Sequence, residues 1–241
     1  MKFFHAVIVF FLMQSGAVEA KVLKSSSHAI PPYVIKAETT TGFEYEIVRD
    51  VLAMQGIQME HQAVPFARVF LRLEKGRVDL GFPVQKVGNM KHLFFSEPHI
   101  KYVNIAVTHP DSGIAINSIK DLGKYELQSF QGASQFLGPE YLAATKKSPK
   151  YKEIAKLEIG IGLIQVKRNE VLVLDSAIYR HMLNTMPKLQ NKVALKVWEV
   201  FPHVEYSVGF RDKSIRDNFD KNLKTYVASG KYQKVIDSYL K

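Results

Sequence analysis

Hydrophobic residues in the first third of the chain recur at helical spacing in some segments and at strand spacing in others. Phe43, Ile47, Val51 and Met54 fall on one face of a predicted helix. The elements predicted in this part are strands at residues 22–26, 58–64 and 78–82, and helices at 42–55 and 66–75. A glycine directly follows each helix, as is common at helix ends. This β-α-β-α-β order is typical of a parallel sheet flanked by helices.

The same alternation returns after a turn-rich segment, His109-Pro110-Asp111-Ser112-Gly113. The pattern here predicts strands at 126–130, 171–174, 193–198 and 206–210, and helices at 118–122, 134–144 and 176–186. Asp212 is placed to cap the first of the closing helices, which are interrupted at Gly230. The second half therefore predicts another α/β unit.

Together these patterns predict an α/β protein of two lobes, each a mostly parallel sheet flanked by helices. One lobe comprises residues 21–105 and 205–241, and the other comprises residues 106–204. The two crossings between them are predicted at 103–108 and 201–206. Two crossings are the plan of a hinged clamp, in which a ligand lies at the carboxyl ends of the strands.

Residues 1–20 have the pattern of a signal peptide. Met1-Lys2 gives a positive start, residues 3–13 are apolar apart from one histidine, and Val18-Glu19-Ala20 matches the motif that signal peptidase cleaves. The apolar run is 11 residues long, whereas a membrane-spanning helix needs roughly 20. We expect cleavage after Ala20 and no insertion into a membrane; an uncleaved anchor helix is the alternative.

Composition and charge exclude several classes of protein. The 241 residues include no cysteine, which excludes a disulfide scaffold, a thiol nucleophile and an iron–sulfur site. The formal net charge is +10, but the lysines and arginines are scattered, and no basic helix carries interleaved aromatic residues. We interpret the charge as a solvated surface and expect no nucleic-acid partner.

Sequence motifs of common enzymes and metal sites are absent. The sequence contains no GxSxG, HExxH, P-loop or GxGxxG motif. His92, His99 and His109 are the histidines nearest to a cluster, and their spacing matches no common metal site. We expect no cofactor and no enzymatic activity, although catalysis by a single acid in a cleft would leave no such motif.

Short motifs stand in a characteristic order along the chain. They are Val64-Pro65-Phe66-Ala67-Arg68, Leu73-Glu74-Lys75-Gly76-Arg77-Val78-Asp79-Leu80, Phe94-Phe95-Ser96-Glu97-Pro98, Gln131-Gly132-Ala133-Ser134, Val171-Leu172-Val173-Leu174-Asp175 and Tyr206-Ser207-Val208-Gly209-Phe210. In this order they resemble the extracellular solute-binding proteins of family 3, which bind polar amino acids for ABC importers. The resemblance implies the type II periplasmic-binding-protein fold.

The resemblance also implies a function. It points to a monomeric periplasmic protein that captures a small polar solute, an amino acid or a related compound, by lobe closure. The implied partner is a membrane permease. Two alternatives stay open: a sensor or orphan binding protein that presents its closed form to a membrane receptor, and an enzyme similar to cyclohexadienyl dehydratase on the same fold.

Positions that match the family imply a ligand site. Tyr33 and Phe66 match the aromatic residues that sandwich the ligand; the alternative for both is a place in the core. Gly132 and Ser134 belong to a loop that would offer N–H groups and a hydroxyl to an anion, or that simply begins a capped helix. Asp175 matches the carboxylate that holds the α-amino group of the ligand, and its alternative is the N-cap of the following helix.

One position departs from the family. Asn89 stands where amino-acid binders carry the arginine that forks onto the ligand carboxylate, and an amide replaces neither its charge nor its geometry. Either Arg68, Lys86 or Lys91 supplies the positive charge, or the ligand is not a standard α-amino acid. Arg68 is the first choice because it follows Phe66 closely; its alternative is a surface arginine.

Overall fold

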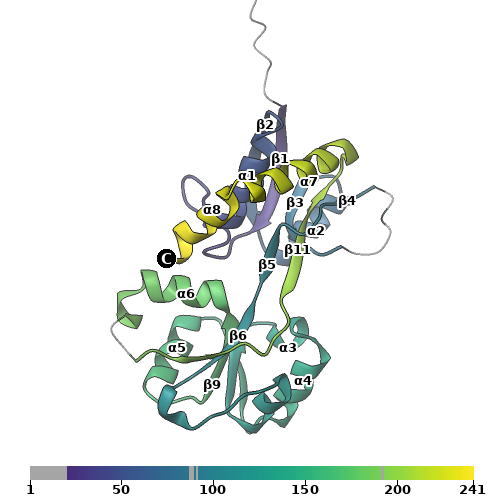
Figure 1. The fold of residues 1–241 in the computed structure, drawn as a ribbon. Helices are drawn as coiled ribbons and strands as arrows, with labels where there is room; N and C mark the ends of the chain where they lie inside the picture. Colours follow the sequence, from purple (N-terminus) through teal and green to yellow (C-terminus); the bar gives the residue numbers. More distant parts are fainter. Residues whose placement is uncertain (1–20, 87–89, 91, 191–192) are drawn as a thin grey trace, which may run out of the picture.

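Two β-sheets, each covered by helices, make up the protein (Figure 1). The computed structural model describes residues 21–86, 90, 92–190 and 193–241. The first sheet has the strand order β2-β1-β3-β11-β4, with β5 paired to β11. Its strands are β1 (Lys21–His28), β2 (Ile57–Val64), β3 (Leu80–Val84), β4 (Phe94–Phe95), β5 (Ile100–Tyr102) and β11 (Val204–Phe210). The helices packed around it are α1 (Phe43–Ala53), α2 (Phe66–Glu74), α7 (Lys213–Ala228) and α8 (Lys231–Leu240).

The second sheet has the strand order β10-β6-β9-β7-β8. Its strands are β6 (Asn104–Thr108), β7 (Leu127–Phe130), β8 (Tyr151–Ile154), β9 (Val171–Asp175) and β10 (Lys196–Trp198). The α-helices of this lobe are α3 (Ala133–Phe136), α4 (Gly138–Lys147), α5 (Leu157–Gln165) and α6 (Ser176–Thr185). Its 3-10 helices are η1 (Pro110–Ser112), η2 (Ile119–Lys124) and η3 (Pro187–Leu189).

Each sheet combines parallel and antiparallel pairs. β1 pairs in parallel with β2 and β3, and β7 pairs in parallel with β8 and β9, as the alternating sequence pattern predicts. β11 is antiparallel to β3, and β6 is antiparallel to β9. These two antiparallel strands are the ones that arrive from the other lobe. The predicted two-lobed α/β architecture is confirmed.

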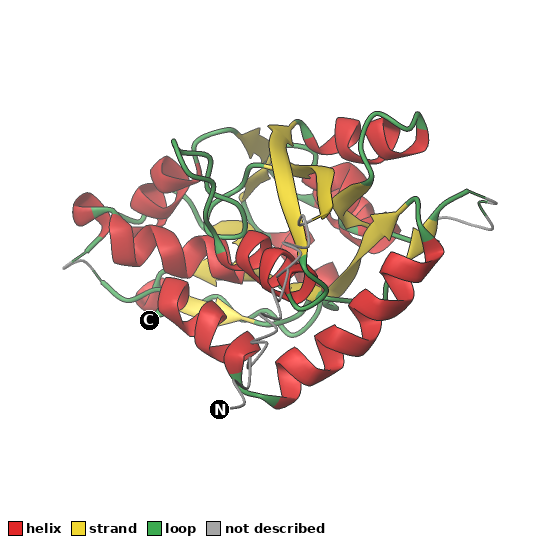
Figure 2. Ribbon diagram, turned by 90° about the horizontal axis from the view of Figure 1, so that it is seen from above, coloured by secondary structure: helices red, strands yellow, loops and turns green. Residues whose placement is uncertain are grey.

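Burial on both faces explains why the central strand β9 reads as one apolar run. All five of its residues are buried. Val171 and Val173 pack in one hydrophobic cluster, and Leu172 and Leu174 pack in another, so helices or loops cover both faces of this strand. Figure 2 shows the same layering for the whole molecule, with helices around the outside and strands in the interior.

Several elements differ from the sequence prediction. The helix predicted at 134–144 is divided into α3 and α4, because Gly138 takes a φ of 85° that interrupts helical geometry. Met54, predicted to face inward, is 47% exposed because α1 ends at Ala53. The segment at 151–165, for which the pattern predicts no element, forms β8 and α5.

The chain passes between the two sheets twice. β5 belongs to the first sheet and β6 to the second, so the first passage is at Val103. The return lies between β10 and β11, over residues 199–203. The crossing strands run through the middle of the molecule, with α6 and α8 on one side and α2 and α3 on the other (Figure 1). The predicted lobe boundaries at 105/106 and 204/205 stay predictions.

None of the helices in the described residues is both long and apolar enough to cross a membrane. The same residues contain no group of three histidine or acidic side chains that could hold a metal ion. The predicted signal peptide lies outside the described residues.

Candidate ligand-binding site

Asp175 lies at the junction of the two lobes. It ends β9, and its Oδ1 accepts hydrogen bonds from the N–H groups of Ala177 at 2.9 Å and Ile178 at 3.0 Å, which makes it the N-cap of α6. The hydroxyl of Tyr33, in the other lobe, lies 3.0 Å from both carboxylate oxygens and donates to them. The N–H of Val103, in the first crossing, donates to Oδ2 at 3.1 Å. Asp175 therefore links both lobes and the crossing between them.

The Tyr33–Asp175 contact is removed from water. Asp175 is 5% exposed and Tyr33 is 1% exposed. Burial raises the pKa of Asp175 to about 6, because its hydrogen bonds, which favour the charged form, offset only part of the loss of hydration. Burial also raises the pKa of Tyr33 well above its usual value. The phenol therefore stays protonated and keeps a hydrogen to donate.

Buried aromatic and polar residues of the same lobe pack around Tyr33. Its ring stacks on Tyr102 with the ring centroids 3.9 Å apart. Tyr102 donates its hydroxyl to Glu44 at 3.1 Å, and Nε2 of His99 lies 3.0 Å from the same carboxylate. The side chains of Glu44 and His99 are fully buried. Tyr33 is thus a core residue of its lobe, and its hydroxyl reaches the other lobe.

Phe66 lies on the opposite side of the crossing strands, where α2 begins (Figure 1). It is 36% exposed, and its ring meets Tyr206 of β11 and His28 of β1 edge to face, at centroid distances of 6.3 Å and 5.9 Å. Phe136, which ends α3 in the second lobe and is 63% exposed, lies 6.2 Å from Phe66 in the same arrangement. The two phenylalanines meet across the lobes and offer apolar surface to a bound molecule.

The loop before α3 binds a carboxylate of the protein itself. Glu153 of β8 accepts hydrogen bonds from the N–H groups of Gly132 at 2.7 Å and Ser134 at 3.0 Å. The hydroxyls of Ser134 and Tyr151 donate to it at 2.8 Å and 2.9 Å. Gly132 has a φ of 83°, a left-handed conformation that favours glycine, and the ring of Phe136 lies against it, 2.6 Å from where a Cβ would be. In this structure Glu153 occupies the predicted anion-binding loop.

Glu153 is held in its charged form. Partial burial raises its pKa, but the hydrogen bonds from Ser134, Gly132 and Tyr151 outweigh burial and lower the pKa to about 2. All four donors are neutral, and no lysine or arginine in the described part of the chain forms an ion pair with this carboxylate. Glu153 therefore carries an uncompensated negative charge at the Gly132 loop, which lies against Phe136.

Arg68 stands apart from these groups. It is exposed on the outer face of α2. It lines a shallow hollow together with Leu71, Arg72, Lys75 and Arg77. Arg68, Leu71, Arg72 and Lys75 recur every three or four positions and so share one face of α2 or its end. Arg68 makes none of the ring contacts of Phe66. Its role in ligand binding stays a prediction, and Asn89 and Lys91 lie outside the described residues.

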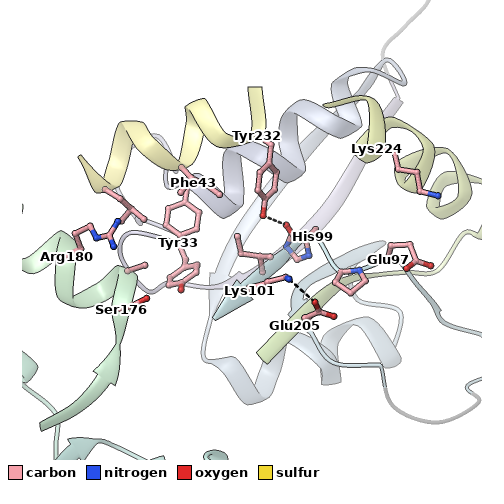
Figure 3. Close-up of a pocket in the computed structure, with 15 residues that line it drawn as sticks. Tyr33, Phe43, Glu97, His99, Lys101, Ser176, Arg180, Glu205, Lys224 and Tyr232 are labelled. Carbon is pink, nitrogen blue, oxygen red and sulfur yellow. Dashed lines mark hydrogen bonds and ion pairs between the residues drawn. The ribbon is translucent and has the colours of Figure 1, made fainter. Parts of the chain in front are cut away.

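A cavity of about 680 Å³ opens on the α6–α8 side of the crossing strands (Figure 3). Tyr33 forms part of its wall, and Arg180 of the second lobe and Lys224 of the first also line it. Lys101 and Glu205, which also line it, form an ion pair at 3.3 Å. This cavity contains neither Phe66 nor the Gly132 loop. Phe66 and the Gly132 loop follow the carboxyl ends of β2 and β7. We therefore take the side of the molecule that carries them as the candidate ligand site.

The structure groups the predicted site residues in three places. Tyr33 and Asp175 form the first group. Phe66 and the loop with Gly132 and Ser134 form the second, and Phe136 connects them. Arg68 stands alone as the third. Sequence reasoning missed Phe136 and Glu153. Phe136 lies two residues after the motif Gln131-Gly132-Ala133-Ser134, and this short distance was a signal that could have identified it. Glu153 had none, because its strand has only four residues and no clear periodicity.

Solved structures with the same architecture support the fold. The GluR0 ligand-binding core in complex with L-glutamate is 17% identical, with a TM-score of 0.71 and coverage of 92% of this chain and 99% of that one. The unliganded, open L-cystine solute receptor of Neisseria gonorrhoeae is 19% identical, with a TM-score of 0.67 and coverage of 92% and 93%. An ancestral amino-acid-binding protein, described as a precursor of cyclohexadienyl dehydratase, is 19% identical, with a TM-score of 0.64 and coverage of 91% and 96%.

These likenesses confirm the predicted periplasmic-binding-protein fold. No curated protein matches the chain significantly in sequence. A family model covers nearly all of the described residues, from 25 to 241. The chain therefore belongs to the bacterial extracellular solute-binding proteins, family 3.

Proposed function

We propose that the protein captures a small polar solute between its two lobes in the periplasm and delivers it to the permease of an ABC importer. Family membership supports capture of an extracellular solute. The observation that carries the proposal is the pair formed by Phe66 and Phe136, one from each lobe, whose rings lie 6.2 Å apart at the carboxyl ends of the strands.

Capture would proceed by rotation of the lobes about the two crossings. Val103 is a single residue between two paired strands, and the return at 199–203 is free of regular structure. Rotation at these segments moves Phe66 and Phe136 relative to each other, because α2 belongs to the first lobe and α3 to the second. Closure around a solute removes water and strengthens the polar contacts inside.

A scattering experiment tests this mechanism. A thermal-shift screen of amino acids, amines, small peptides and organic acids first identifies a ligand, because a solute at 100 times its dissociation constant stabilises the fold by about 2.7 kcal/mol. Small-angle scattering with that ligand should then show a smaller radius of gyration, while circular dichroism stays unchanged. An unchanged radius of gyration at saturation would count against lobe closure.

Export is tested separately. If residues 1–20 are removed by signal peptidase, the intact mass of protein recovered from the periplasm should correspond to a chain that begins at Lys21. Retention of the first 20 residues would remove the support for a periplasmic binding protein.

A further inference from the structure

The groups predicted to bind an amino-acid ligand are already engaged by the protein. An α-amino acid needs donors for its carboxylate and an acceptor for its ammonium group. The donors predicted for the carboxylate, at Gly132 and Ser134, are bound to Glu153. The acceptor predicted for the ammonium group, Asp175, already accepts hydrogen bonds from Tyr33 and three backbone N–H groups. The predicted partners of both the carboxylate and the ammonium group of an amino acid are therefore occupied.

The carboxylate of Glu153 nevertheless retains a free acceptor position. Its Oε1 accepts three hydrogen bonds, from the N–H and the hydroxyl of Ser134 and from Tyr151. Its Oε2 accepts one, from Gly132. Because a carboxylate oxygen has two lone pairs, Oε2 can accept another hydrogen bond. An ammonium or guanidinium group is the donor best suited to a carboxylate whose own partners are all neutral.

Aromatic surface lies next to this carboxylate. The ring of Phe136 lies so close to Gly132 that an added Cβ would be 2.6 Å from it, and Gly132 donates to Glu153. Phe66 faces Phe136 from the other lobe. The faces of aromatic rings attract cations. The charge and the rings therefore favour the same kind of ligand.

We infer that the solute is an organic cation without a free carboxylate, held against Phe66 and Phe136 with its ammonium or guanidinium group on Glu153. This inference rests on the proposed solute-binding function and names the ligand class of the same site. Glu153 takes the place of a ligand carboxylate at the Gly132 loop and turns an anion site into a cation site.

Matched ligand pairs test the inference. Agmatine and arginine, cadaverine and lysine, and tyramine and tyrosine each share a cationic or aromatic part and differ in the carboxylate. In titration calorimetry with the mature protein, at least one amine should bind, and its amino acid should bind on the order of tenfold more weakly or not at all. Tighter binding of the amino acid in every pair that binds would overturn the inference.

Two variants locate the bound cation. Glu153→Gln keeps the shape of the side chain and removes its charge, so amine affinity should fall on the order of tenfold. Glu140→Gln removes one negative charge from an exposed position of the same lobe and should leave the affinity unchanged. Phe136→Ala changes a side chain that is 63% exposed. This substitution should leave the fold intact and lower the affinity for amines several-fold.

The outcomes separate the two proposals. If amino acids bind and compact the protein while Glu153→Gln binds them like the parent, the ligand class is wrong and solute capture stands. If no amine binds, the ligand class is wrong. If, in addition, no solute of the wider screen binds, solute capture is wrong as well.

Discussion

Two carboxylates of the second lobe, Glu153 and Asp175, occupy similar positions and behave in opposite ways. They lie at or near the carboxyl ends of β8 and β9, the strands on either side of β7. Each accepts hydrogen bonds from four neutral donors. Yet the pKa of Asp175 is raised to about 6 and that of Glu153 is lowered to about 2. Donor number therefore does not decide the direction of the shift.

Contact with water makes the difference. Asp175 is 5% exposed, so most of its hydration is lost and four hydrogen bonds replace only part of it. Glu153 is only half-buried, so it retains hydration and the same number of hydrogen bonds becomes a net gain. The hydrogen-bond donors of the two carboxylates also come from different parts of the molecule. Asp175 binds both lobes and the crossing, whereas Glu153 binds only its own lobe and sets the charge of the candidate site.

The largest expected effect follows from removing the buried carboxylate. Asp175→Ala leaves the Tyr33 hydroxyl and the N–H groups of Val103, Ala177 and Ile178 without their acceptor. The free energy of unfolding should fall by about 2–4 kcal/mol, because buried unpaired donors and a lost helix cap are both destabilising. Urea unfolding followed by circular dichroism measures this change.

Asp212→Ala is the matched control for that variant. Asp212 caps α7 through Ser214 and Ile215 in the same way, but it is exposed and makes no contact across the lobes. Its loss should lower the free energy of unfolding by about 1 kcal/mol. Equal effects of the two substitutions would mean that Asp175 is only a helix cap and that its contact with Tyr33 adds nothing.

The fold could be predicted from the sequence because its signals are long and repeated. The helical periodicities of α1 and α2 and the alternation in β2 each reflect one face that must be buried, and the continuous apolar run of β9 reflects burial of both faces. The identity of the partner at each polar residue could not be predicted. Gly132 and Ser134 show where donors lie, but not that Glu153, about 20 residues later, would accept from them. Such contacts depend on strand order and register, which short motifs do not specify.

A smaller effect is expected when only the contact between the lobes is removed. Tyr33→Phe keeps the ring stacked on Tyr102 and removes the hydroxyl that donates to Asp175. The free energy of unfolding should fall by about 1–2 kcal/mol, as for other buried hydrogen bonds to a charged group. Because this hydrogen bond also lowers the pKa of Asp175, that pKa should rise further in the variant.

Tyr125→Phe provides the control for the loss of a hydroxyl. Tyr125 is half-buried in the second lobe, and its hydroxyl donates an exposed hydrogen bond to the carbonyl of Ala115 at 3.2 Å. Its substitution should change the free energy of unfolding by about 0.5 kcal/mol or less. The pKa of Asp175, followed by carboxyl-carbon NMR, should not move. A Tyr33 variant as stable as the Tyr125 variant would show that the lobes do not depend on this contact.

Apart from the control variants, the smallest effect should come from Glu153, and its dependence on pH should be opposite to that of Asp175. At pH 7, Glu153→Gln should lower the free energy of unfolding by about 1 kcal/mol. The folded pKa of about 2 is below the ordinary value of 4.5, so the unfolded chain binds its proton first as the pH falls. The advantage of the parent over the variant should therefore be complete above about pH 4.5 and disappear towards pH 2.

Asp175→Asn gives the opposite trend. The folded pKa of about 6 exceeds the ordinary value of 3.8, so the folded protein takes up the proton first. The stability of the parent relative to this variant should rise as the pH falls from about 6 towards 3.8 and then stay level. Chemical unfolding of the parent and both variants across this range measures the two slopes together. Slopes of the same sign would contradict the explanation by hydration, because two carboxylates with equal donors would then respond alike despite their different exposure.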